Sequence, residues 1–236
     1  MTILITAGPT REAIDPVRYL TNRSSGKMGY ALADVAAAKG NRVILISGPT
    51  DAALEVPDGV DFIPVESAAD MYVAVERWMA KADVAIFAAA VADYRPVEFV
   101  EQKIKTVGDE LTLQLVRNAD ILGSARGKFL FEGTLVGFAA ETENVVENAR
   151  GKLLKKGCDM VVANDVSRKD IGFDSDENEV ILVFRDEEET VAKADKHRIA
   201  HSVVEVAMGM EEDRQRSVSD GANTNTHVEG DQQKIL

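Results

Sequence analysis

The chain has 236 residues, of which 45% are hydrophobic and 28% are charged, and its formal net charge is −13. This composition is typical of a globular protein rather than a disordered one, and the acidic balance argues against general nucleic-acid binding. The single cysteine, Cys158, excludes an intrachain disulfide and an all-cysteine metal site, and no run approaches the ~20 apolar residues of a membrane span.

No cationic stretch precedes the first apolar residues, Thr2 to Ile5. A secretory leader requires such a stretch followed by a longer apolar region. We therefore expect no leader, no membrane contact and a cytoplasmic location.

Strands and helices alternate in the first half of the chain. Apolar runs predict strands at residues 3–6, 43–46, 61–65 and 84–90. Helical spacing of apolar residues predicts helices between them, at residues 30–39 and 68–80. This order is typical of βαβ units, and near-continuous apolar runs are typical of parallel strands buried on both faces. We therefore expect an α/β fold with a doubly wound, mostly parallel, Rossmann-like sheet.

The pattern changes after Asp93. Residues 110–116 alternate between leucine and polar residues, which predicts a half-buried antiparallel strand and hence an antiparallel extension of the fold. Later elements are expected as strands at 135–137, 160–163, 180–184 and 190–191, and as helices at 144–156 and 196–208. Apolar residues become scarce after Met208. The expected organisation is one domain over residues 1–208 and a disordered, acidic polar tail over residues 209–236.

A polar turn links the first strand to the first helix. Gly8 ends the strand, and Ser24, Ser25 and Gly26 directly precede the helix. Such a turn offers free N–H donors and a favourable helix dipole to a phosphate, so these four residues form a candidate phosphate loop. A helix cap at Ser24 or Ser25 explains the two serines equally well. Nearby cations favour the anion site: Arg11, Arg18, Arg23 and Lys27.

Neither of the two commonest phosphate motifs is present. Gly26 and Lys27 are followed by Met28 rather than by Ser or Thr, and no G-x-G-x-x-G follows the first strand. The second strand ends at Ser47, Gly48 and Pro49, where an NAD enzyme usually has an acidic residue for the ribose. A dinucleotide oxidoreductase is therefore disfavoured, although it stays open, as does a non-catalytic nucleotide sensor.

Other polar residues have both a functional and a structural interpretation. Lys152 and Lys156 share one face of a predicted helix, and their spacing alone favours a solvated basic face over a phosphate site. Cys158 follows a helix end and is expected to be buried and inert. His197 and His201 are four residues apart, but no accompanying carboxylate pattern supports a metal site, so we expect them on the surface.

Seven segments, between Ile3 and Phe184, carry a more specific signal through their joint order and spacing. They are ITAGPTRE at 5–12, DPVRY at 15–19, NRSSGKMG at 22–29, AAVADY at 89–94, KIK at 103–105, GFAAET at 137–142 and ANDV at 163–166. Together they resemble the phosphopantothenoylcysteine synthetase family of coenzyme A biosynthesis, also called phosphopantothenate–cysteine ligases.

The resemblance implies a ligase reaction. The family joins 4′-phosphopantothenate to L-cysteine with a nucleoside triphosphate, which is CTP in the bacterial type that this chain is similar to. The substrate carboxylate attacks the α-phosphate and gives an acyl-cytidylate and diphosphate; the cysteine amine then displaces CMP. The protein aligns the reactants and neutralises charge, Mg²⁺ usually accompanies the triphosphate, and no protein nucleophile is required.

The resemblance also implies roles for individual residues. Asn22 matches an asparagine that contacts the acyl phosphate, and Lys103 matches a lysine of a mobile loop that neutralises the same group and assists the cysteine attack. Lys152 and Lys156 match triphosphate-binding lysines, which favours the functional interpretation of that helix face. The implied nucleotide-binding residues are Phe87, Ala88, Ala89, Asp93, Lys103, Asn118, Ala119, Asp120, Ile121, Phe138, Lys152 and Lys156. No protein metal ligand is assigned.

The resemblance also implies protein partners, and the chain differs from the family pattern at two positions. The resemblance implies a homodimer, for which residues 110–116 are a candidate contact. Many bacterial relatives carry an N-terminal flavin-dependent decarboxylase domain; we expect no flavin here and a separately encoded decarboxylase. Ala119 stands where the family often has Pro, and Thr106 stands where a further basic residue is frequent. Both departures are expected to alter loop rigidity more than chemistry.

Overall fold

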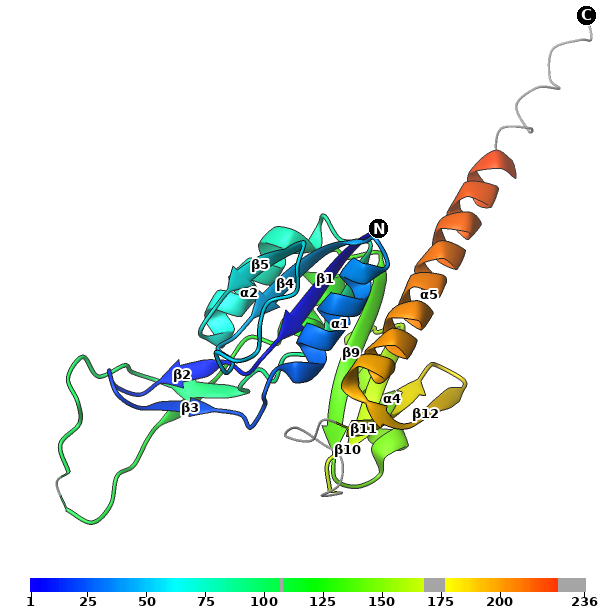
Figure 1. The fold of residues 1–236 in the computed structure, drawn as a ribbon. Coiled ribbons are helices and arrows are strands. Elements are labelled where there is room, and N and C mark those ends of the chain that lie inside the picture. The colour runs from blue at the N-terminus through cyan, green and yellow to red at the C-terminus, as the bar shows by residue number, and fades with distance from the viewer. Residues whose placement is uncertain (107, 168–176, 225–236) are drawn as a thin grey trace, which may run out of the picture.

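The computed structural model describes residues 1–106, 108–167 and 177–224 of the chain (Figure 1). An eight-stranded sheet forms its centre. In order across the sheet, the strands are β12 (Glu188–Asp195), β11 (Glu177–Val183), β10 (Met160–Asp165), β9 (Thr134–Glu141), β6 (Val84–Phe87), β1 (Thr2–Ala7), β4 (Arg42–Ser47) and β5 (Val60–Pro64). The six strands from β10 to β5 are parallel, whereas β11 and β12 are antiparallel. The expected α/β fold with a doubly wound, mostly parallel sheet is confirmed.

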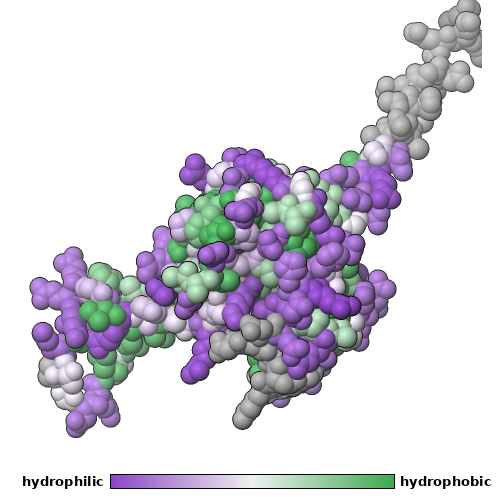
Figure 2. Space-filling model, in the orientation of Figure 1, coloured by the Kyte–Doolittle hydropathy of each residue, from purple (hydrophilic) through white to green (hydrophobic). Residues whose placement is uncertain are grey.

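Two short antiparallel ribbons lie outside this sheet. One pairs β2 (Arg11–Ala13) with β3 (Tyr19–Thr21), and the other pairs β7 (Tyr94–Pro96) with β8 (Leu115–Arg117). Residues 11–21, 94–106 and 108–117, which include both ribbons, form what we call the arm, and it extends away from the sheet (Figure 1). Apolar side chains are exposed on this arm (Figure 2). The expected antiparallel extension is therefore present.

The predicted strand at residues 110–116 is largely wrong. Only Leu115–Arg117 is a strand, and the side chain of Leu111 is 57% exposed rather than half-buried. The partner strand β7 is three residues long, and its pairing continues only as far as the hydrogen bond from Val97 N to Gln114 O (3.0 Å). Alternation of side chains indicates a possible strand, but a strand also requires a backbone partner along its length.

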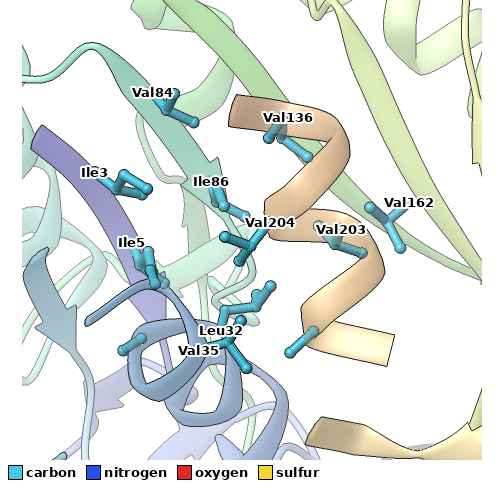
Figure 3. Close-up of a cluster of buried hydrophobic side chains, with 14 of the residues drawn as sticks. Ile3, Ile5, Leu32, Val35, Val84, Ile86, Val136, Val162, Val203 and Val204 are labelled. Atoms are coloured by element: carbon cyan, nitrogen blue, oxygen red, sulfur yellow. The ribbon is translucent and has the colours of Figure 1, made fainter. Parts of the chain in front are cut away.

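Helices cover both faces of the main sheet. On one face lie α1 (Lys27–Ala38) and α5 (Lys196–Thr224); on the other lie α2 (Ala68–Met79), α3 (Ile121–Gly127) and α4 (Val145–Lys156). Alternate residues of each strand serve the two cores: Ile3 and Ile5 of β1 point toward α1 and α5, whereas Leu4 packs on the opposite side (Figure 3). Full burial of each such side chain contributes roughly 1.5–3 kcal/mol. Packing, more than helix propensity, therefore holds the layers together.

The first helix begins at a glycine rather than at a serine. Gly26 is the N-cap of α1, with φ of 78°. Ser24 Oγ instead accepts a hydrogen bond from Gly26 N at 3.3 Å. A Cβ at residue 26 would lie 2.5 Å from Thr50 Cγ2. The alternative prediction of a serine N-cap is thus wrong, because close packing against the 47–50 loop and a positive φ both require glycine there.

The last helix extends beyond the predicted domain end at residue 208. α5 runs to Thr224, so a disordered tail beginning at residue 209 is wrong for residues 209–224. Glu211 is 4% exposed, and its Oε2 accepts hydrogen bonds from Thr134 N and Thr134 Oγ1, both at 2.9 Å. Arg214 contributes an ion pair to Asp159 at 3.1 Å. These polar contacts to the start of β9 and the segment before β10 hold the helix where apolar residues are scarce.

This anchor predicts a stability difference between two adjacent glutamates. Glu211→Ala leaves the buried Thr134 hydroxyl without its acceptor and removes one of the two acceptors of the Thr134 N–H, the other being Asp83 O. It should lower the free energy of unfolding by about 1–3 kcal/mol. The matched change Glu212→Ala removes only an exposed ion pair to Arg216 and should cost less than ~1 kcal/mol. Urea unfolding of both variants measures the difference, and equal losses would contradict the anchoring role.

Candidate functional site

A cavity of about 580 Å³ opens at the carboxyl ends of β1, β6 and β9. It lies where the order of strand addition reverses: β4 pairs with one side of β1, and β6, which comes later in the chain, pairs with the other. In doubly wound sheets this reversal point is where ligands bind. The cavity is lined by Thr6, Phe87, Ala89, Val91, Ala92, Asp93, Tyr94, Arg117, Asn118, Ala119, Asp120, Ile121, Leu122, Phe138, Lys152, Lys155 and Lys156.

The segment that follows β6 forms one wall, and its strand pairing is reduced to an isolated parallel bridge between Pro9 and Ala90. Its amides are bonded instead by β1 and the loop after it: Ala89 N donates to Thr6 Oγ1 at 3.3 Å, and Ala92 N donates to Thr10 Oγ1 at 3.0 Å. Asn22 Nδ2 donates to two carbonyls of the same segment, Ala90 O at 3.1 Å and Val91 O at 3.0 Å. The wall is therefore stiffened by side chains from the N-terminal motifs.

A second wall is built around Asn118, which is 8% exposed. Its Nδ2 donates to Ala92 O at 2.8 Å, and its Oδ1 accepts from Arg95 Nη1 at 2.9 Å. Its backbone N–H donates to Asp93 O, also at 2.8 Å. These bonds place residues 118–121 beside residues 92–93, so two stretches far apart in the sequence face the same cavity.

Four cations face the cavity from two directions. Arg117 comes from β8, whereas Lys152, Lys155 and Lys156 come from the C-terminal half of α4. Lys152 Nζ donates to the carbonyl oxygen of Phe138, and burial is the main cause of a pKa below that of an ordinary lysine. An anionic ligand bound beside Lys152 would stabilise the charged form of this lysine.

Asp120 shows how the acidic groups of the cavity are balanced. Burial would raise the pKa of its carboxyl, but hydrogen bonds from Lys156 Nζ and Gly123 N, with the positive charge of Lys152 nearby, lower it overall. Asp120 therefore stays ionised and holds Lys156 against the cavity wall. The lining contains one other carboxylate, Asp93.

Most of the nucleotide-binding residues expected from the sequence are brought together here. Those that line the cavity are Phe87, Ala89, Asp93, Asn118, Ala119, Asp120, Ile121, Phe138, Lys152 and Lys156. Ala88 lies between two of them and donates its N–H to Thr6 O at 3.1 Å. Asn22 touches the wall through the two carbonyls described above. The convergence is observed, while the role of each residue stays a prediction.

Lys103 and the candidate phosphate loop lie elsewhere. Lys103 is exposed on the arm and does not line the cavity. Gly8, Ser24, Ser25 and Gly26 do not line it either. Gly8 has φ of 70°, and a Cβ there would lie 2.7 Å from Gly48 O. Its conformation and packing account for a glycine at this position without any ligand.

Several lining residues were not singled out from the sequence. Arg117 and Tyr94 adjoin expected residues, and their side chains lie together, with Arg117 Cζ 5.9 Å from the Tyr94 ring centre. Lys155 adjoins Lys156, and this pair of consecutive lysines near a helix end was a usable signal. The others are Thr6, Val91, Ala92 and Leu122. Thr6 lies on β1, Val91 and Ala92 lie in the segment after β6, and Leu122 lies on α3.

Four further side chains lie outside the cavity lining. Cys158 is buried, as expected, and burial raises the pKa of its thiol to about 11, which keeps it protonated and inert. His197 and His201 lie on the surface, as expected, beside Asp34 and Glu205. Asn164, at the end of β10, has a buried Oδ1 with no hydrogen-bond partner among the described residues. A buried amide oxygen of this kind is normally satisfied by a water or a ligand.

Comparisons with known proteins agree with this architecture. Residues 1–210 match the family described as the DNA/pantothenate metabolism flavoprotein C-terminal domain. The chain is 48% identical over 205 residues to the coenzyme A biosynthesis bifunctional protein CoaBC of Vibrio parahaemolyticus serotype O3:K6 (strain RIMD 2210633), covering 86% of this chain and 51% of that protein. It is 51% identical over 185 residues to CoaBC of Bacillus subtilis (strain 168), covering 78% and 45%.

A solved structure gives the same result. The crystal structure of the C-terminal domain of the coenzyme A biosynthesis bifunctional protein CoaBC has a TM-score of 0.74 and 44% identity, covering 89% of this chain and 96% of that one. The chain spans about half the length of the curated relatives it matches. It belongs to the DNA/pantothenate metabolism flavoprotein C-terminal domain family, the phosphopantothenoylcysteine synthetase family that its motifs resemble.

Proposed function

We propose that this chain is a phosphopantothenate–cysteine ligase that uses CTP. It joins 4′-phosphopantothenate to L-cysteine through an acyl-cytidylate and releases CMP and diphosphate. Family membership and the names of the CoaBC relatives support a place in coenzyme A biosynthesis. The observation that carries the proposal is the convergence of Arg117 and three α4 lysines on one cavity at the strand-order reversal. A triphosphate is the polyanion that such a cluster fits.

The chemistry follows from the cavity's composition. A carboxylate is a poor electrophile until one of its oxygens becomes part of a phosphate leaving group. Lys152, Lys155 and Lys156 hold the triphosphate and stabilise the diphosphate that leaves, while Phe138 and Phe87 offer apolar surface to the base. Asn22 donates hydrogen bonds to the wall formed by residues 90–91, and its proposed role is to contact the activated acyl group there. The protein contributes alignment rather than a covalent nucleophile.

Mg²⁺ fits this site as a companion of the nucleotide. Among the described residues, no group of three or more His, Cys, Asp and Glu side chains could hold a metal ion by itself. Mg²⁺ in triphosphate sites is typically held by one or two carboxylates together with phosphate oxygens. Asp93 and Asp120 are the carboxylates in the cavity lining, and Mg²⁺ there would offset negative charge on the phosphates.

The chain's setting is also part of the proposal. Among residues 1–106, 108–167 and 177–224, no helix has both the length and the apolar character needed to cross a bilayer. A cytoplasmic location, a chain without flavin and a decarboxylase supplied by a separate protein stay predictions.

Lys103 provides the sharpest test of the reaction. Lys103→Gln removes the charge proposed to neutralise the acyl phosphate during cysteine attack. Diphosphate release from CTP and phosphopantothenate should therefore persist, while formation of the cysteine product should fall by about 10²–10³-fold, as for the loss of one charge-stabilising group. Rapid-quench assays of the two half-reactions, with ATP in place of CTP as a parallel series, make the measurement. Equal loss of both steps would contradict the role of Lys103, and no CTP turnover by the unmodified chain would overturn the ligase.

Lys152 predicts a pH dependence of nucleotide binding. Because burial lowers the pKa of Lys152, its ammonium loses its proton at a lower pH than an exposed lysine does. CTP affinity should therefore weaken as the pH rises from about 7 toward 10. Lys152→Arg carries a charge that does not titrate in this range, so it should flatten the profile, whereas Lys155→Arg should not. Calorimetric titration across this range distinguishes them, and an unaltered profile in Lys152→Arg would contradict the assignment.

We also propose a homodimer formed through the arm. Large apolar side chains are exposed on it: Val17, Tyr19, Tyr94, Val97, Phe99, Val100, Leu111, Leu115 and Val116 (Figure 2). Such a concentration of exposed apolar residues is typical of a protein interface. The proposed dimer contact therefore includes more of the arm than residues 110–116.

The dimer is tested by charge substitution at equally exposed sites. Phe99→Asp on the arm, where the side chain is 55% exposed, should shift the sedimentation coefficient toward that of a monomer. Val73→Asp on α2, where the side chain is 63% exposed, should leave it unchanged. A monomeric unmodified chain at micromolar concentration, or a dimeric Phe99→Asp variant, would count against the interface.

A further inference from the structure

The most heavily bonded carboxylate of the arm belongs to Asp15, at the turn between β2 and β3. The residue is 2% exposed. Its Oδ1 accepts hydrogen bonds from Val17 N and Arg18 N, both at 2.9 Å, which close the turn. Its Oδ2 accepts from Arg18 Nε at 3.0 Å and from Arg18 Nη2 at 2.6 Å. The two oxygens therefore have separate tasks, one in the turn and one in an ion pair.

The Asp15–Arg18 ion pair also forms hydrogen bonds to the backbone of Ile104, which is distant in the sequence. Asp15 Oδ2 also accepts from Ile104 N at 3.1 Å, and Arg18 Nη2 donates to Ile104 O at 3.1 Å. Both backbone groups of Ile104 are thus engaged by one acid–base pair from the turn. A third tie, from Val100 N to Ile14 O at 3.1 Å, lies four residues earlier in the same loop. Residues 100–104 are consequently held at the end of the β2–β3 hairpin.

The charge of Asp15 is required for this grip. Hydrogen bonds from Arg18, followed by those from the backbone N–H groups, hold the pKa of the Asp15 carboxyl far below its ordinary value despite the opposing effect of burial. The carboxylate therefore keeps its negative charge throughout the pH range in which enzymes work. Charge-assisted hydrogen bonds to a buried carboxylate are among the stronger polar contacts in proteins.

We propose that Asp15, together with Arg18, is a positioning residue that fixes the Ile104 peptide and thereby the adjacent Lys103. The inference rests on the proposed function, in which Lys103 assists the cysteine step. Asp15 touches neither substrate nor the reacting atoms; it acts through the loop. A long lysine side chain delivers charge to a reacting group only if its own backbone is held, because small displacements cost catalysis steeply. The alternative is that Asp15 serves the hairpin turn alone.

Asp15→Asn separates these two roles. The amide oxygen of asparagine can keep the Oδ1 bonds from Val17 and Arg18, but an NH₂ group in place of Oδ2 cannot accept from Arg18 or Ile104. The variant should keep the hydrogen bonds that close the turn and lose the hydrogen bond between Asp15 and the Ile104 amide. Asp51→Asn is the matched control, because Asp51 accepts only a local bond from Ala53 N at 2.8 Å in an exposed loop.

The first readout is hydrogen exchange at the Ile104 amide, which does not depend on activity. Asp15→Asn should speed exchange of this amide by roughly tenfold or more, with protection of β1 and β6 unchanged. Asp51→Asn should leave it unaltered. If Asp15→Asn fails to fold, Arg18→Lys replaces it, since lysine cannot bond Asp15 and Ile104 O through a planar fork. Unchanged exchange at Ile104 in the folded variant overturns the proposal.

The second readout is the division between the two half-reactions. Asp15→Asn should lower the rate of the cysteine step by about 10–100-fold while diphosphate release falls far less. Adding it to Lys103→Gln should give little further loss, because both changes remove the same contribution. Faster exchange with an unimpaired cysteine step overturns the positioning role. If Lys103→Gln itself leaves that step intact, the proposed role of Lys103 fails, while the exchange result still tests the grip on the loop.

Discussion

The reversal of strand order beside β1 is the constraint on which the rest of the site depends. β4 and β6 flank β1, and the cavity opens where the chain continues beyond β6. Beyond β6 the described backbone pairs with the loop after β1 through an isolated bridge between Pro9 and Ala90, and the remaining polar groups of this segment still have to be satisfied. Those hydrogen bonds come from the side chains of Thr6, Thr10, Asn22 and Asn118. Several polar residues of the sequence motifs therefore stabilise the wall of the site.

The electrostatics of the cavity oppose those of the whole chain. The chain carries a net charge of −13, yet the cavity lining holds four cations and two carboxylates. One carboxylate, Asp120, is itself bonded to Lys156. The negative field of the whole chain would repel an anionic ligand, whereas the cations of the cavity would attract it, so the binding of such a ligand should depend strongly on ionic strength. Lys152 is largely removed from water and donates to Phe138 O. A bound polyanion would therefore stabilise the charge of Lys152 more than that of an exposed lysine.

The arm has a different physical basis from the body. Its strands are three residues long and most of its side chains are exposed. Hydrogen bonds join β2 to the body, from Arg11 N to Glu66 O at 2.8 Å and from Ala68 N to Glu12 Oε1 at 2.9 Å. Hydrogen bonds and ion pairs hold a unit of this kind together. The clearest example is the Asp15–Arg18 ion pair with its hydrogen bonds to Ile104. Its exposed apolar surface and its loop lysine give it two proposed tasks, association and catalysis.

The sequence by itself determined the parallel sheet, its covering helices and the family. Buried parallel strands need continuous apolar runs, helices need a 3.6-residue period, and the motif order from ITAGPTRE to ANDV is specific. Only the tertiary structure decided that residues 110–114 form no strand, that α5 continues past residue 208 on Glu211, and that Arg117 joins the α4 lysines. Each of these outcomes depends on a partner far away in the chain, and a local pattern of residues carries no record of that partner.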